Sequence, residues 1–391
     1  MSEKVSIPLL NDHHSHPLFY SAFRNAIDFS DVIEKEHAFD LIRDRAAVSN
    51  QLVLGRSWKD NFFQFEPSEL ESLPPCAIFN ISLHNLAINR SAMEMLSGRI
   101  GSDITKLYDR EWYERNLQSV LNWFALLNGS AQGLREFFDS LESIGVWSTE
   151  EMLLVDPVEI DWFDEAGLAE RTKFWADPRT FKTMDERHKK QVAGIKLFTD
   201  GAFGARSAAN SQAYIGQPEN FGMLIYSDDE LARVAMEHAS DELSLAVHAI
   251  GDRAIEQTIT MFEKHDVSNR YRLIRIEHAQ AITLDQAQRA SDLGIILSMQ
   301  PNFNIDSINY SDRLPAIYVE GNNPFRMLID DVGFEPGVDL ILGSDGMPHG
   351  ADNAIEQSLS PANELQKLTL AEFIAGYCGV SDKMFEVSLP I

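Results

Sequence analysis

Residues 245–280 read LAVHAIGDRAIEQTITMFEKHDVSNRYRLIRIEHAQ, and this stretch decides the fold. It begins with a short apolar run, continues through an amphipathic segment at residues 254–264, and ends with a second apolar run at residues 273–280. Short runs rich in Ile, Leu and Val are typical of strands that are buried on both faces. A strand, a helix and a second strand in this order predict one βα unit of a parallel sheet.

The same pattern recurs along the chain, because further apolar runs also end abruptly in polar residues. These runs are SIPLLNDHHSH (6–16), GIKLFTDG (194–201), GIILSMQP (294–301) and VDLILGSDG (338–346). Residues 227–239 and 283–293 have the amphipathic spacing of helices between strands. We therefore predict an α/β fold, a (β/α)₈ TIM barrel, with its active site at the carboxyl ends of the strands.

Two long segments interrupt this alternation of strands and helices. We expect residues 1–391 to form a single barrel domain, in which residues 17–145 include an inserted helical and loop region over the barrel mouth. We also expect residues 17–145 to contain the second and third barrel units. A second insertion, residues 302–337, follows the seventh strand.

Composition limits the partners and the location of the protein. The chain has 33 basic and 60 acidic residues and a net charge of −27, which disfavours binding to nucleic acid or to anionic membranes. The first residues lack the basic and apolar regions of a signal peptide, so we expect a cytoplasmic protein. Cys76 and Cys378 are the only cysteines, and any metal must therefore be held by histidines, carboxylates or a less usual ligand.

Two histidines end the first predicted strand. Alternate residues of a strand point to the same side, so His14 and His16 can face one metal ion. Two surface or loop histidines are the alternative interpretation. His248 and His278 interrupt later strands near their ends, where a single histidine is more often a satisfied core residue. Two such histidines on separate strands, together with the first pair, favour a metal site.

Lys196 lies inside the apolar run GIKLF, and lysine is rarely buried without a partner. It either reaches water or Asp200 from the strand end, or has reacted with carbon dioxide to form a carbamate. A carbamate is an anion that can bridge two metal ions, and burial favours its formation because it lowers the pKa of the amine. Asp345 follows the last strand, where it is either a turn residue or a carboxylate that binds metal and transfers a proton.

This pattern of four histidines, a lysine and an aspartate resembles the binuclear subtype of the amidohydrolase superfamily. More narrowly, the chain resembles amidohydrolase family 3, the branch that includes N-substituted formamide deformylase, from about Ile7 to Gly379. The matching segments are DHHSH (12–16), GIKLFTDG (194–201) with Arg206 after it, HAIGDRA (248–254), EHA (277–279), QP (300–301) and GSD (343–345).

The resemblance implies a centre of two divalent metal ions, which we expect to be zinc. His14, His16 and Asp345 would hold one ion, His248 and His278 the other, and carboxylated Lys196 would bridge them. A hydroxide shared by the ions would attack a substrate carbonyl, and Asp345 would pass a proton to the departing amine. The expected activity is hydrolysis of a non-peptide C–N bond in a small molecule.

Three further residues are candidates for substrate contacts. His84 and the following segment NRSA (89–92) resemble a part of the same branch, and His84 would stabilise the oxyanion or hold the substrate. Arg206 would bind a polar or anionic part of the substrate, with a structural ion pair as the alternative. Gln300 would reach the pocket from strand seven, or would support a metal ligand instead.

The sequence leaves several alternative folds, activities and assemblies open. Family relatives combine both ends of the chain in a small β-sandwich, most of which we expect to be lacking here. Lactone or phosphoester hydrolysis would use almost the same ligands, whereas deamination typically uses one metal and lacks the bridging lysine. A barrel that binds a small molecule without catalysis would be expected to lack a ligand. A homodimer is a further expectation, because barrel hydrolases often dimerise.

Overall fold

The computed structural model describes residues 4–48, 52–59, 62–80, 83, 85–100, 106–107, 110–379 and 382–390. The chain divides into two compact units. One consists of Met1–Pro17 and Phe138–Ile391, and the other of Leu18–Phe137.

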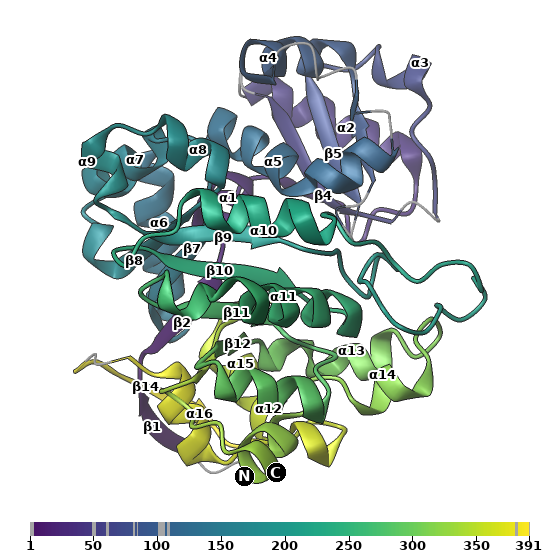
Figure 1. Cartoon of the computed structure of the whole chain (residues 1–391). Helices are drawn as coiled ribbons and strands as arrows, with labels where there is room; N and C mark the ends of the chain where they lie inside the picture. The colour runs from purple at the N-terminus through teal and green to yellow at the C-terminus, as the bar shows by residue number, and fades with distance from the viewer. Residues whose placement is uncertain are drawn as a thin grey trace. The chain divides into compact units, whose positions relative to one another are not determined.

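An eight-stranded parallel sheet forms the centre of the first unit (Figure 1). Its strands are β2 (Leu10–Ser15), β7 (Val146–Leu154), β8 (Thr172–Ala176), β9 (Val192–Phe198), β10 (Ser244–Ala249), β11 (Ile274–His278), β12 (Ile296–Met299) and β13 (Leu340–Leu342). They are hydrogen-bonded in this order, and in the register Ala246 pairs with Lys196 on one side and with Arg275 on the other. This register sets the height of the site residues in the sheet.

The first and last strands approach each other closely, so that the sheet is a nearly closed barrel. The Asp345 amide donates to the His14 carbonyl at 2.7 Å, and the Ser344 amide donates to the buried Asp12 carboxylate at 2.8 Å. Gly343 permits this approach, because a Cβ atom there would lie 2.5 Å from the His14 nitrogen. The predicted (β/α)₈ barrel is therefore confirmed.

Helices follow the strands and lie outside the sheet, as α10, α11 and α12 show in Figure 1. They are α7 (Val158–Ala166), α8 (Pro178–Thr183), α9 (Glu186–Lys189), α10 (Asp228–Glu237), α11 (Asp252–His265), α12 (Leu284–Asp292), α15 (Ala351–Leu359) and α16 (Leu370–Tyr377), with short 3₁₀ segments η2 (Ala169–Arg171), η3 (Val267–Asn269) and η6 (Glu364–Gln366). Ser227 and Thr283 cap α10 and α12 in reciprocal capping boxes, which confirms the two helices predicted there.

The prediction that residues 17–145 hold the second and third barrel units is wrong. Those strands are β7 and β8, which come later in the chain. Glu150 and Glu151 of β7 and Lys173 of β8 interrupt their apolar runs, and this charge concealed both strands in the sequence. The expected insertion after the seventh strand is present as η4 (Pro301–Ile305), α13 (Asp306–Asn309), α14 (Ala316–Glu320) and the π-helix η5 (Met327–Val332).

The second unit has its own sheet, in the order β3 (Ile27–Asp28), β4 (Val53–Trp58), β5 (Cys76–Asn80) and β6 (Leu86–Ile88), with β5 and β6 antiparallel. The helices of residues 17–143 are α1 (Pro17–Phe23), α2 (Lys35–Val48), α3 (Pro67–Leu70), α4 (Arg90–Ile100), α5 (Arg110–Asn128) and α6 (Ala131–Ser143). Two apolar clusters, one around Phe79 and Phe124 and one around Phe29 and Ile42, form its core. The expectation that this region covers the barrel mouth stays a prediction.

Strands from near the two ends of the chain form a separate small sheet. β1 (Lys4–Pro8) pairs antiparallel with β14 (Met384–Ser388), with Lys4 opposite Ser388. Among the described residues, none of the helices combines the length and the apolar composition needed to cross a lipid bilayer.

Candidate metal centre

Histidines from three strand ends form a continuous row inside the barrel unit. The ring centroids of His16 and His14 are 5.7 Å apart, those of His14 and His278 are 4.6 Å apart, and those of His278 and His248 are 4.6 Å apart. All four residues are buried, and each is at most 9% exposed to solvent. Residues from β2, β10 and β11 are thus brought together as the sequence predicted.

Asp345 completes a group of ligands at one end of this row. Candidate ligand atoms of His14, His16 and Asp345 all lie within 4.8 Å of one another, close enough to share one ion. Asp345 Oδ1 is 3.3 Å from His16 Nε2 and 3.8 Å from His14 Nε2. Asp345 has a positive φ of 54°, which directs the chain after β13 back toward β2.

The charge states of the histidines follow from burial and from their neighbours. Burial, together with the charge of Lys196, holds the pKa of His14 well below its ordinary value, and burial together with His248 does the same for His278. Both imidazoles are therefore neutral at pH 7, which is the form that binds metals. Burial also lowers the pKa of His16, but Asp345 and Glu151 outweigh it and raise it to about 9. An ion that binds there must displace a proton.

Lys196 of β9 is 1% exposed, and its Nζ has no hydrogen-bond partner among the described residues. Burial lowers the pKa of this amine to about 8, against the opposing effect of Glu277 and Asp345. The Nζ atom lies 5.0 Å from the centre of the Phe198 ring. An amine of lowered pKa without a partner is well suited to form a carbamate, so the donor set fits a centre bridged through this residue.

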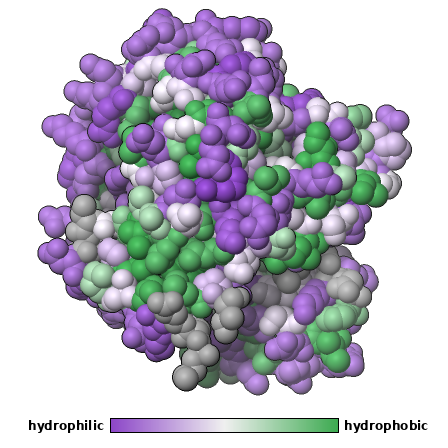
Figure 2. Space-filling view, turned by 90° about the horizontal axis from the view of Figure 1, so that it is seen from below, coloured by the Kyte–Doolittle hydropathy of each residue, from purple (hydrophilic) through white to green (hydrophobic). Residues whose placement is uncertain are grey.

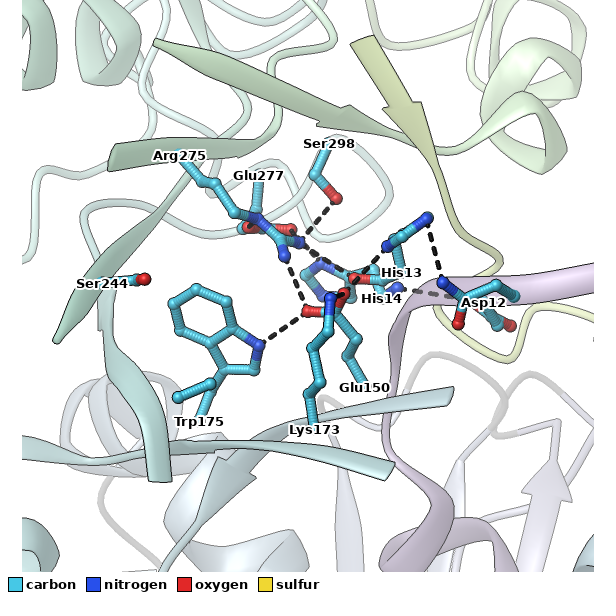
Figure 3. A network of polar contacts seen from close by, with 12 residues as sticks. Asp12, His13, His14, Glu150, Lys173, Trp175, Ser244, Arg275, Glu277 and Ser298 are labelled. Carbon is cyan, nitrogen blue, oxygen red and sulfur yellow. Dashed lines mark hydrogen bonds and ion pairs between the residues drawn. The ribbon is translucent and has the colours of Figure 1, made fainter. Parts of the chain in front are cut away.

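Carboxylates and an arginine support His14 from behind. His14 Nδ1 donates to Glu277 Oε2 at 2.6 Å, and both residues are buried. Arg275 donates to both oxygens of Glu277, at 2.7 and 3.0 Å, and to Glu150 Oε2 at 2.6 Å. Figure 3 shows this network, in which Trp175 also donates to Glu150. The network fixes the orientation of the His14 ring and leaves its Nε2 for an ion.

The nearest hydrogen-bond partners of His278 and His248 are uncharged groups. His278 Nδ1 donates to Gln300 Oε1 at 2.7 Å, while the Gln300 amide nitrogen donates to the Ser298 carbonyl at 3.2 Å. His248 Nε2 contacts the Gly201 carbonyl at 3.1 Å. Gln300 is fully buried, and its contact with His278 fits the supporting role, while its predicted contact with substrate stays a prediction.

The two remaining candidates are placed differently. Arg206 lies in the loop after β9 with a φ of 55°, and its Nε is buried without a hydrogen-bond partner in the described part of the chain. The proposed contact of Arg206 with substrate stays a prediction. His84 lies outside the described residues, so its predicted role also stays a prediction.

Sequence reasoning gave no role to two residues of this centre. Glu277 directly precedes His278, and its place two residues after Arg275 in a buried strand was a usable signal of a paired charge. His349 lies in the loop after Asp345, and its Nε2 is 2.8 Å from Ser15 Oγ, between the two ligands of β2. No spacing rule connects His349 with Ser15, so the sequence alone could not reveal this contact.

Residues 129–354 match the model of the Amidohydrolase family. YtcJ of Bacillus subtilis, whose name assigns it to the amidohydrolases, is 34% identical over 354 residues, or 76% of this chain and 63% of YtcJ. N-substituted formamide deformylase of Arthrobacter pascens is 32% identical over 117 residues, or 30% of this chain and 21% of that enzyme.

An uncharacterized metal-dependent hydrolase from Pyrococcus horikoshii has a similar solved structure, with a TM-score of 0.71 and 21% identity. The match covers 94% of this chain and 78% of that one, and it supports the barrel fold. The chain spans less than two thirds of the length of the curated relatives that it matches over long stretches. It covers 63% of YtcJ and 60% of a second relative.

Proposed function

Because the chain belongs to the amidohydrolase family, we propose that it is a metal-dependent hydrolase that cleaves a non-peptide C–N bond of a small molecule. The observation that carries this proposal is the convergence of His14, His16 and Asp345 within 4.8 Å, beside a buried amine without a partner. Buried charges in such number are costly unless an ion satisfies them. The resemblance to N-substituted formamide deformylase supports an amide-type bond.

In this proposal, six residues hold two divalent ions, which we expect to be zinc. His14, His16 and Asp345 would hold one ion, His248 and His278 would hold the other, and carboxylated Lys196 would be a ligand of both. When bound, the ions supply a hydroxide nucleophile at neutral pH and polarise the carbonyl that it attacks. Neutral His14 and His278 present their Nε2 atoms, because Glu277 and Gln300 engage the Nδ1 atoms.

Asp345 has a second task in the proposed reaction. Its Oδ1 lies at the edge of the ligand group, and its side chain is 19% exposed, so a substrate can reach it. Asp345 takes a proton during the attack and delivers it to the nitrogen of the leaving amine. Arg206, with an unpartnered Nε, binds a polar or anionic part of the substrate, and His84 stabilises the oxyanion or holds the substrate.

The test is a substrate screen with the zinc-loaded protein. N-formyl and N-acyl amines should release free amine, and Asp345→Asn should lower kcat by about 10²- to 10⁴-fold, the usual contribution of a proton-transfer group. The metal content of Asp345→Asn serves as the control, because this residue is also a proposed ligand. Turnover of lactones or phosphotriesters alone would replace the proposal with one of those activities. No turnover of any class by the zinc-loaded protein would favour a binding protein.

A further inference from the structure

His14 and His278 of the proposed centre each have a hydrogen-bond acceptor close to Nδ1. The two acceptors differ in charge, because one is a carboxylate and the other is an amide. His14 Nδ1 is 2.6 Å from a carboxylate oxygen of Glu277, and His278 Nδ1 is 2.7 Å from the amide oxygen of Gln300. All four residues are at most 2% exposed. Both histidines therefore use Nδ1–H as a donor and keep Nε2 for a ligand, but only His14 is backed by an anion.

Glu277 forms an ion pair with a buried arginine. Arg275 donates two hydrogen bonds to it and one to Glu150, and is itself 3% exposed. Arg275 therefore faces two buried carboxylates, as Figure 3 shows, and the charge of Lys196 also acts on both of them. Lys173 also reaches Glu150 at 3.3 Å, but its side chain is 60% exposed and its charge is screened by solvent. The network thus places a carboxylate, that of Glu277, directly behind His14.

Further carboxylates belong to the same half of the centre. His16 Nδ1 lies 3.6 Å from the buried carboxylate of Glu151, and Asp345 is itself an anion. His248 Nε2 lies 3.3 Å from Asp200, but its nearest acceptor is the Gly201 carbonyl. The Asp200 carboxylate already accepts hydrogen bonds from three backbone amides, which spread its charge. These amides belong to Ala209, Ile250 and Gly251.

A carboxylate behind a metal-bound imidazole raises the basicity of the imidazole, and a neutral amide does so much less. From these contacts we infer that the two halves of the centre differ in affinity. The half formed by His14, His16 and Asp345 binds its ion first and more tightly, and Glu277 is the positioning residue that produces the difference. This inference rests on the proposed metal-dependent function, and goes beyond it by ordering the two sites.

Metal titration of the full chain tests the inference without any substrate. The protein is stripped with a chelator, and Zn²⁺ is added in competition with a chromophoric chelator to obtain two dissociation constants. The parent should give two distinct constants. His16→Ala should abolish the tighter one, and His248→Ala should abolish the weaker one. These two variants assign each constant to its half of the centre.

Glu277→Gln keeps the size and one acceptor oxygen of the side chain but removes its charge. It should weaken the tighter constant by about 10- to 100-fold and leave the weaker one nearly unchanged. Gln300→Leu is the matched variant, and it should weaken only the second constant. The thermal unfolding of each variant shows whether it is folded. If one variant does not fold, the two dissociation constants of the parent still show whether the two sites differ in affinity.

The outcomes separate this inference from the proposed function. Two equal constants in the parent, loss of the tighter constant in His248→Ala, or an unchanged tighter constant in folded Glu277→Gln would each overturn the inference, while the two-metal centre would stand. No Zn²⁺ binding by the parent would overturn the proposed function itself.

Discussion

Lys196 places a cationic side chain in a position that is 1% exposed, and its Nζ has no hydrogen-bond partner among the described residues. A buried ammonium group without a partner is costly, so a chain under selection for stability alone would carry an apolar residue there. The proposed carboxylation would remove this cost, because a carbamate is an anion that metal ions and neutral histidines can surround. This residue therefore connects the stability of the barrel with its proposed chemistry.

Asp306, at the start of α13, is a partly buried acid rather than a buried amine. Burial raises its pKa to about 7, although Gln280 donates to it at 2.9 Å. The folded protein thus keeps a proton on Asp306 that the unfolded chain loses above about pH 4. Between about pH 4 and pH 7 the folded state binds more protons, so this group makes the protein less stable as the pH rises.

Asp306→Asn should therefore raise Tm at pH 8 by about 1–3 °C, and the gain should shrink at pH 5. Differential scanning calorimetry at both pH values measures the effect. Asp312→Asn is the control, since this exposed carboxylate pairs with Arg313, which holds its pKa below the ordinary range. A larger gain at pH 5 than at pH 8 would contradict the account of Asp306.

At the scale of elements, the closure of the barrel depends on the short strand β13. Gly343 follows this strand, and a Cβ atom there would lie 2.5 Å from the nitrogen of His14 and 2.8 Å from its Cβ. Gly343→Ala should push β13 away from β2 and displace both His14 and Asp345. We expect a loss of about 1–3 kcal/mol in the free energy of unfolding, as for other overpacked positions, and a lower zinc content.

Urea unfolding and elemental analysis measure these two effects. Gly133→Ala is the control, because Gly133 lies in α6 and the new Cβ would lie 3.3 Å from Ser130 Oγ, an ordinary hydroxyl that can shift slightly. That variant should be as stable as the parent or slightly more stable, owing to the helix propensity of alanine. Gly343→Ala with full stability and full zinc content would contradict the closure described here.

The strands that carry the candidate ligands could be predicted from the sequence, because each is an apolar run that ends in a histidine, lysine or aspartate. β7 and β8 could not, because Glu150 and Lys173 interrupt their apolar pattern to form ion pairs inside the barrel. The positions of the candidate ligands could be predicted for the same reason, because these residues end the apolar runs. The support of His14 by Glu277 was not predicted, since no spacing in the sequence reveals this contact, whereas support of a metal ligand was one of the two roles predicted for Gln300.

At the scale of the whole molecule, the chain combines a barrel unit with a second compact unit, Leu18–Phe137, that has its own sheet and core. Figure 2 shows a face on which hydrophilic residues surround smaller hydrophobic areas. The chain has a net charge of −27, from which weak binding to anionic partners is predicted. Homodimer formation and the absence of nucleic-acid partners stay predictions from the sequence.

The metal content per chain tests the central claim most directly. Elemental analysis compares the parent with Lys196→Ala, both produced with zinc in the medium. About two equivalents in the parent and a marked loss in the variant are expected, because Lys196 is proposed to bridge both ions. One equivalent that is unaffected by the variant would point to a mononuclear enzyme and favour deamination. No metal in either protein would contradict the metal-dependent function altogether.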